Sequence, residues 1–205
     1  MLFQYTISPL YCNSYVSGLQ KKIISEIFFS VLSNIGLNIG GDYLIVPTRI
    51  LTVKMASKVV ESWRTVKAIP NYEDFVGELL FRKIFTLAPQ VHGMFRFAKD
   101  FEPMSEELFA SERFKEHARG VVITIGKVVS MLGPDLDPLI NILHDLGRIH
   151  GNYGALPAHY AIVGRALIET LSEVLGGQFT NELKTSWARV YDIVSAAMIE
   201  GAEGD

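Results

Sequence analysis

Residues 138–160 contain a histidine whose position on an apolar helix would allow it to bind a metal ion. His150 continues a row of leucines, at positions 139, 143 and 146, that recur at steps of three and four residues. This spacing puts the four side chains on roughly one face of a helix. A histidine on an apolar stripe is more often an ordinary core or surface residue than a metal ligand. The role of His150 therefore depends on what another element places opposite it.

A second histidine, His117, lies on the apolar face of another predicted helix, residues 112–132. The apolar positions of that helix recur at helical spacing and are Phe114, Val121, Ile125, Val128 and Leu132. Two helices that each present one imidazole from an apolar face could enclose a flat, apolar ligand that carries a metal. Imidazole binds iron well, and a haem needs a dry pocket with few polar groups. The two histidines together therefore indicate a haem site.

The residues around both histidines, taken in order, resemble the globin family. The segment from Leu146 to Gly164 has the pattern L-x3-H-x6-P-x2-Y-x2-V-G, which is similar to the proximal segment of a globin. Further matches stand in the family's order: Trp63, Phe85, Pro89, Phe95, His117 with Val121, and Trp187 with Tyr191. The resemblance covers about residues 55–203, and the last helix is most similar to neuroglobin-like and cytoglobin-like members.

The resemblance implies an all-α globin fold, a three-over-three sandwich of eight helices, with an N-terminal extension. It also implies a haem b cofactor with His150 as the proximal iron ligand and His117 on the distal side, as a possible sixth ligand. The second ring nitrogen of His150 would then donate to a backbone carbonyl one turn earlier, near Leu146. The residues expected to contact the cofactor are Phe81, Phe95, His117, Val121, Leu146, His150, Tyr160 and Val163.

The function implied by the resemblance is reversible binding of dioxygen, for transport or storage, with NO and CO as further ligands. One alternative is a six-coordinate, bis-histidyl globin that acts in redox, nitric oxide or nitrite chemistry with an external reductase. The spacing of 33 residues between the histidines (150 minus 117) and the last helix favour that class. A second alternative is a haem-free globin fold that serves as an interaction module.

A dedicated enzyme is not favoured, although nitric oxide dioxygenase or nitrite reductase side activity stays open. Flavohaemoglobin-type nitric oxide dioxygenases usually have tyrosine and glutamine at the positions of Phe81 and His117. They also carry a reductase domain, and the chain has no glycine-rich dinucleotide fingerprint.

Several polar positions leave alternatives open. His144 lies six residues before His150, about 120° away around the same helix, and is the rival proximal ligand. His92 and His159 neighbour turn or helix-start residues and are expected to be solvated. Position 120 is glycine, where many globins carry a basic residue near a haem propionate, so Arg119 or Arg148 could take that role.

Composition narrows the class of protein. The 205 residues carry a net charge of −3, and no basic cluster indicates nucleic-acid binding. A single cysteine, Cys12, makes an intramolecular disulfide impossible, which is consistent with the cytoplasmic location we expect. Residues 1–54 contribute +2, from four basic and two acidic residues, which leaves about −5 for the remainder.

Residues 1–54 are expected to be an N-terminal extension, poorly ordered or non-native, before a globin domain at 55–203. Residues 23–40 are its most hydrophobic part, but Glu26 and several Ser and Asn residues interrupt them. The stretch is marginal for a membrane helix, which needs ~20 mostly apolar residues. Membrane attachment through this extension is therefore possible but not favoured.

Beyond the extension, the periodicity predicts helices and no sheet. A helical stripe begins at Val59, and the later helices are expected at 72–87, 112–132, 138–150, 157–175 and 179–200. Asn71 is expected to cap the second of these helices. Gly77 within it predicts close approach of the helix that carries His117, with Ala118 as the small partner.

Overall fold

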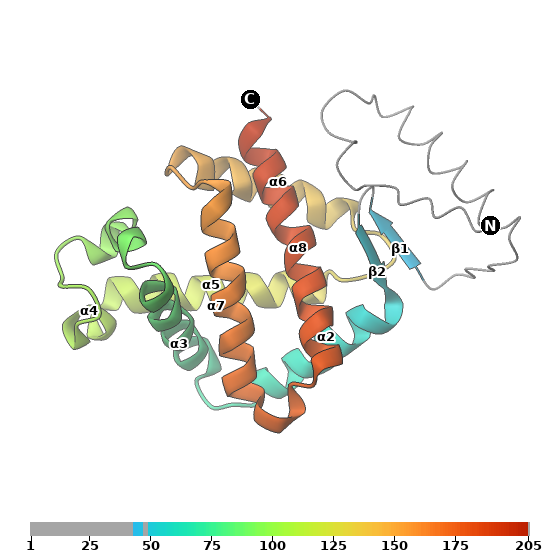
Figure 1. The fold of residues 1–205 in the computed structure, drawn as a ribbon, viewed down its shortest axis with the longest axis horizontal. Coiled ribbons are helices and arrows are strands. Elements are labelled where there is room, and N and C mark those ends of the chain that lie inside the picture. The colour runs from blue at the N-terminus through green and yellow to red at the C-terminus, as the bar shows by residue number, and fades with distance from the viewer. Residues whose placement is uncertain (1–42, 47–48, 205) are drawn as a thin grey trace, which may run out of the picture.

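The computed structural model describes residues 43–46 and 49–204, and most of these residues are helical. The elements are β1 (Tyr43–Val46), β2 (Arg49–Thr52), α2 (Val53–Lys67), α3 (Tyr72–Leu87), η1 (Pro89–Met94), η2 (Arg96–Ala98), α4 (Glu106–Ala110), α5 (Glu112–Ser130), α6 (Asp137–Asn152), α7 (Pro157–Leu175), η3 (Gly176–Gln178) and α8 (Asn181–Glu203). Helices α2, α5 and α6 pack over α3, α7 and α8 (Figure 1). The predicted all-α, three-over-three globin fold is confirmed.

The described chain begins with a two-stranded antiparallel hairpin, which the periodicity did not predict. Its register places Tyr43 opposite Thr52 and Val46 opposite Arg49. Each strand has only four residues, so a period-of-two pattern is too short to recognise in the sequence. Leu51 of β2 is fully buried in the main core, and α2 begins two residues later. The boundary at residue 55 stays a prediction, and the expectations for residues 1–42 lie outside the described residues.

Helices α2 and α8 meet through the two tryptophans that the resemblance singled out. The rings of Trp63 and Trp187 lie 5.9 Å apart, and each residue is 2% exposed. Trp187 Nε1 donates to Ser62 Oγ at 3.0 Å, and Ser62 Oγ donates to the Val59 carbonyl at 2.9 Å. The buried N–H of Trp187 and the hydroxyl of Ser62 are thus satisfied, which anchors α8 on α2.

Helices α3 and α5 approach one another at the glycine that the sequence predicted. A Cβ atom built on Gly77 would lie 2.9 Å from the Ala118 carbonyl oxygen and 3.1 Å from the Ala118 Cβ. These distances are shorter than ordinary van der Waals contact, so only glycine allows this spacing. Ala118 directly follows His117 in the chain, so this contact fixes the position of His117 relative to α3.

Helices α6 and α8 are packed just as closely, again through glycine. A Cβ on Gly147 would overlap the backbone of Met198, and one on Gly201 would overlap the backbone of His144. Backbone atoms cannot move aside as side chains can, so α6 is held firmly on α8. No described helix is both long and apolar enough to span a membrane.

Helices α7 and α8 are joined by a buried tyrosine. The Tyr191 hydroxyl donates to the Tyr160 carbonyl at 2.6 Å, and the Tyr191 ring lies where a side chain on Gly164 would stand. Burial raises the pKa of Tyr191, so its hydroxyl stays protonated and remains a donor. The hydrogen bond fixes the first turns of α7, which follow the turn after His150.

Two glycine substitutions test the α3–α5 contact. We expect Gly77→Ala to lower the free energy of unfolding by about 1–3 kcal/mol, because the new methyl group meets backbone. Gly120→Ala is the matched control on α5, where a Cβ has nothing within 4 Å. It should raise the free energy of unfolding by ~0.5–1 kcal/mol through helix propensity alone. Urea denaturation measures both, and equal stability of the two variants would contradict the close approach.

Candidate functional site

His150 lies in the last turn of α6, with one ring nitrogen bound to its own helix. Its Nδ1 is 2.8 Å from the Leu146 carbonyl oxygen, as the resemblance led us to expect. A carbonyl can only accept, so Nδ1 carries the hydrogen, and in the neutral tautomer of this ring Nε2 has the lone pair. The residue is exposed, so this lone pair is accessible. His150 is thus held in the tautomer that a metal ligand needs.

His117 lies on α5 with phenylalanine rings around it. Its ring centre is 4.9 Å from that of Phe97, 5.4 Å from that of Phe81 and 5.8 Å from that of Phe95. Desolvation lowers the pKa of His117, and the nearby charge of His150 lowers it further. His117 is nevertheless exposed. Because its pKa is lowered from 6.5, the ring of His117 is neutral at pH 7.

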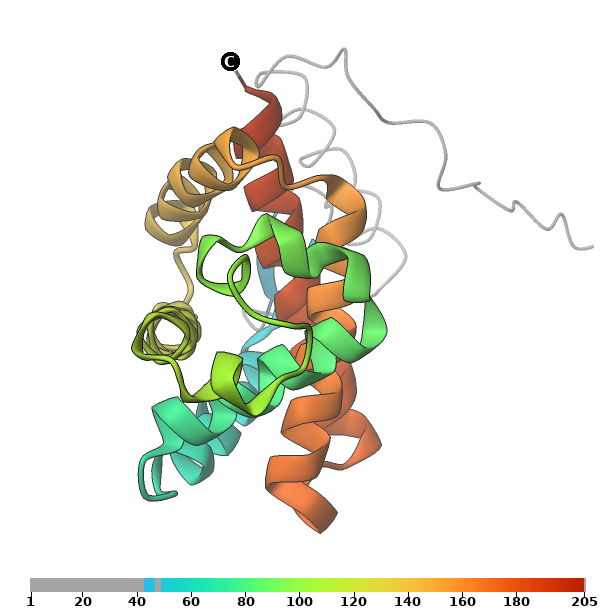
Figure 2. The ribbon, with the colours of Figure 1, turned by 90° about the vertical axis from the view of Figure 1, so that its left-hand side faces the viewer.

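The two imidazoles come from helices that are held apart. Helix α5 packs mainly on α3 and α2, whereas α6 packs mainly on α8. Figure 2 looks nearly along α5 and shows α6 passing on the same side of the molecule, with the two ribbons well separated. Since the charge of His150 acts on the pKa of His117, the two imidazoles lie near each other. The arrangement can hold a flat group between two nitrogen donors.

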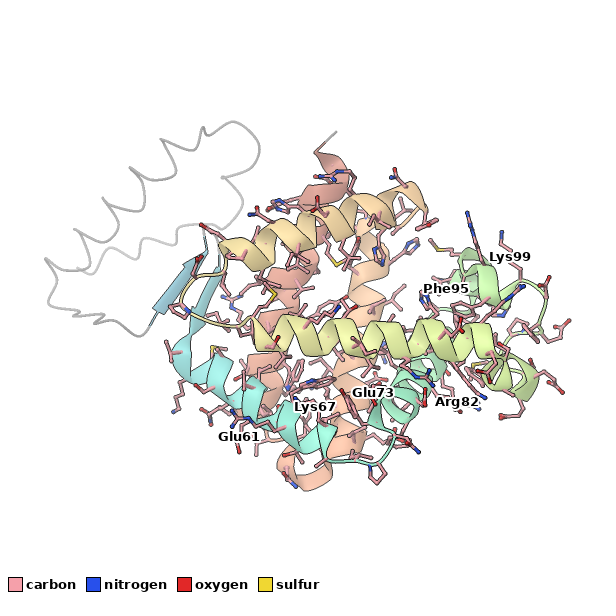
Figure 3. All side chains as sticks on the ribbon, turned by 180° about the vertical axis from the view of Figure 1, so that it is seen from behind. Glu61, Lys67, Glu73, Arg82, Phe95 and Lys99 are labelled. Carbon is pink, nitrogen blue, oxygen red and sulfur yellow. The ribbon has the colours of Figure 1, made fainter. Side chains whose placement is uncertain are left out.

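A cluster of phenylalanines surrounds the His117 side of the candidate site. Phe81 is its centre and is 2% exposed. Its ring lies within 6 Å, centre to centre, of those of Phe85, Phe95, Phe97 and Phe114. Phe95, labelled in Figure 3, lies on the side of α5 that faces α6. Phe97 is the ring nearest to His117, and the sequence analysis did not single it out because aromatic residues in a loop are usually ordinary core residues.

The other predicted contact residues lie on both sides of the space. Val121, one turn after His117, and Val163 are half-buried against the main core, to which Phe81 and Phe95 also belong. Leu146 and Tyr160 belong to a second apolar cluster, between α6 and α8, with Leu139 and Leu143. The predicted contact residues therefore belong to two neighbouring apolar clusters. The role of these residues as cofactor contacts stays a prediction.

The remaining histidines have other partners, and the expectation that His92 is solvated is wrong. His92 is 8% exposed and packs against Phe85 at 5.4 Å, because η1 folds back onto α3 and covers the turn. His159 is half-buried, and its Nδ1 accepts the Leu156 N–H at 3.0 Å, so it caps α7. His144, the rival ligand, has its Nε2 3.6 Å from the Glu200 carboxylate of α8.

The basic residues next to the two histidines are already paired. Arg119 forms a two-pronged contact with Asp74 of α3, at 2.9 and 3.0 Å. Arg148 donates to Asp145 at 3.0 Å within α6. Asn71, expected to cap α3, has left-handed backbone angles and makes no side-chain cap bond. The partner of Arg119 comes from another helix, so neighbouring residues in the sequence could not predict this pairing.

The family model and the similar proteins that match this chain indicate the same family. Residues 78–198, from α3 to α8, match the family model described as Globin. The chain is 33% identical over 125 residues to neuroglobin of Tetraodon nigroviridis, covering 61% of this chain and 77% of that protein. It is 31% identical over 153 residues to neuroglobin of Danio rerio and 30% over 153 residues to neuroglobin-2 of Oncorhynchus mykiss, covering 74% of this chain and 92% of each relative.

The lowered pKa of His117 makes stability depend on pH. As pH falls below the ordinary value of 6.5, the unfolded chain takes up a proton on this residue before the folded chain does. The free energy of unfolding therefore has its full value above that pH. It decreases as the pH falls further, until the pH is below the lower pKa that His117 has in the folded state. In His117→Leu this part of the decrease should vanish. Urea denaturation between about pH 7.5 and pH 5.5, without added cofactor, measures it, and parallel curves would contradict the assignment.

Proposed function

Because this chain belongs to the globin family, we propose that it holds a haem b between His150 and His117 and binds dioxygen reversibly. The observation that carries the proposal is a pair of imidazoles, near enough for the charge of His150 to lower the pKa of His117, on helices that each pack mainly on other helices. The donor set is the one that haem iron accepts. NO and CO, which bind the same metal, are the further expected ligands.

The residues present fit such a group. Large apolar side chains next to His150 in the chain are exposed, with Ile149 at 51%, Tyr153 at 64% and Leu156 at 58%. A porphyrin face would cover apolar surface of this kind, and each Å² removed from water contributes about 25 cal/mol. On the opposite side the phenylalanine cluster offers ring faces and edges without hydrogen-bonding groups. The chain thus provides two apolar walls and two nitrogen donors.

Haem iron, when bound, supplies the site for the diatomic ligand. The residues of the chain orient that site and control its surroundings. The Leu146 carbonyl fixes the His150 ring and makes its Nε2 a stronger donor. Neutral His117 has one N–H to donate to dioxygen on its own side, a hydrogen bond worth about 1.5–3 kcal/mol where partial charge is present. Phe81, Phe95 and Phe97 keep water from the same face.

Coordination of the iron by His117 itself is the second candidate. Among the described residues no hydrogen bond to a His117 ring nitrogen is found, and the ring is neutral, so a lone pair is available. This supports a bis-histidyl globin in redox, nitric oxide or nitrite chemistry, with an external reductase as partner. The relatives in the comparisons are neuroglobins, which agrees with the spacing of the histidines.

Substitution of His150 tests the proximal assignment. We expect His150→Gly to lose haem during purification, and added imidazole to restore the bound spectrum by replacing the missing side chain. His144→Gln, on the same helix, is the control and should retain haem. Soret and visible spectra measure both. If His150→Gly retains the wild-type spectrum, the ligand is wrong, and if the wild-type chain takes up no hemin, the haem-free interaction module becomes the better reading.

Substitution of His117 separates the two candidates. If His117 donates a hydrogen bond, His117→Leu should weaken dioxygen affinity about ten- to a hundredfold, and the ferrous spectrum should be five-coordinate in both proteins. If His117 coordinates the iron, the ferrous wild-type spectrum should be six-coordinate, and the variant should become five-coordinate and bind CO faster. Unchanged affinity and unchanged spectra would contradict both roles.

A further inference from the structure

An arginine and a tyrosine meet where the segment carrying Phe95 reaches the helix carrying His150. The guanidinium carbon of Arg96 lies 5.5 Å from the centre of the Tyr153 ring, within the range of cation–π attraction. Arg96 follows Phe95 directly, and Tyr153 is the third residue after His150. Both side chains are exposed. The contact therefore joins the two sides of the candidate site at its solvent edge.

The guanidinium of Arg96 is also not paired with an acidic side chain among the described residues. In the part of the chain that the structure describes, no carboxylate lies within ion-pair distance of it, whereas Arg119 and Arg148 each hold an aspartate. The position expected to carry a basic residue, 120, is glycine. Arg96 is thus a cation at the edge of the site that remains free to bind an anion.

We propose that Arg96 binds a propionate carboxylate of the haem, with Tyr153 stacked on the guanidinium to hold it in place; this rests on the proposed function. The two propionates are the charged groups of haem b, so they must leave the apolar slot at its solvent edge. Stacking uses the face of the guanidinium, and its N–H groups, which lie in the plane, stay available. A carboxylate can accept two of them in parallel.

The test compares haem b with its dimethyl ester, in which both propionates are neutral. The rate at which hemin leaves the reconstituted protein for an excess of a haem scavenger is measured for wild type, Arg96→Gln, Arg96→Lys and the control Arg119→Gln. For haem b we expect Arg96→Gln to lose hemin about two- to tenfold faster, Arg96→Lys to fall between, and Arg119→Gln to match wild type. For the ester all four rates should coincide.

Each outcome separates this proposal from the function on which it rests. Failure of the wild-type chain to take up hemin would overturn the proposed function itself. Uptake with equal haem b rates for wild type and Arg96→Gln would overturn the propionate contact alone. A rate increase that is the same for haem b and for the ester would show that Arg96 acts only through the fold.

Tyr153 provides a second, independent arm. Tyr153→Phe keeps the ring and should retain the wild-type rate for haem b, whereas Tyr153→Leu removes the stacking partner and should lose haem b faster. The difference between these variants should disappear with the ester. If Tyr153→Leu loses both forms faster to the same extent, the tyrosine acts as an apolar contact, and the stacking role is wrong.

Discussion

The backbone contacts that glycine permits on either side of the candidate site determine where its two histidines stand. Gly77 lets α3 approach the backbone of Ala118, and Gly147 and Gly201 let α6 and α8 approach each other. Neither contact joins α5 to α6. The two helices that carry the imidazoles are thus held mainly by different helices, α5 by α3 and α6 by α8. The separation of α5 and α6 at the candidate site therefore follows from their packing on α3 and α8.

The chemistry at the two histidines differs because their surroundings differ. His150 is bound through Nδ1 to its own helix and is exposed, so its tautomer is fixed by a hydrogen bond. His117 is held by ring contacts, and desolvation keeps it neutral. One imidazole is therefore oriented by a directional bond and the other by packing. The first suits a permanent ligand, and the second suits a group that can rotate between donating a hydrogen bond and coordinating a metal.

The sequence predicted the elements whose signals are local. The bounds 72–87 match α3, and the Gly77–Ala118 pair was found because both residues are small at the right height on their helices. The His150–Leu146 hydrogen bond came from the family pattern and is local as well. The hairpin, the burial of His92 and the pairing of Arg119 with α3 were missed. Each of these depends on contacts between segments distant in sequence, or on strands too short to show a period. The grouping of the predicted contact residues could not be derived from the sequence for the same reason. They belong to two apolar clusters whose members come from segments distant in the chain.

If the chain holds haem as proposed, the close packing of α5 and α6 on their neighbours bears on how an external ligand would compete with His117 for the iron. Moving α5 away from α6 would open the contact at Gly77, and moving α6 would open its backbone contacts with α8; both would lose close-packed surface. Rotation of the His117 side chain disturbs only ring contacts, the closest being with Phe97 at 4.9 Å. The second movement costs less, since each aromatic contact contributes about 0.5–1.5 kcal/mol. Exchange between the two roles of His117 is therefore expected to run through the phenylalanine cluster, which makes Phe97 the residue that sets how readily the ring turns.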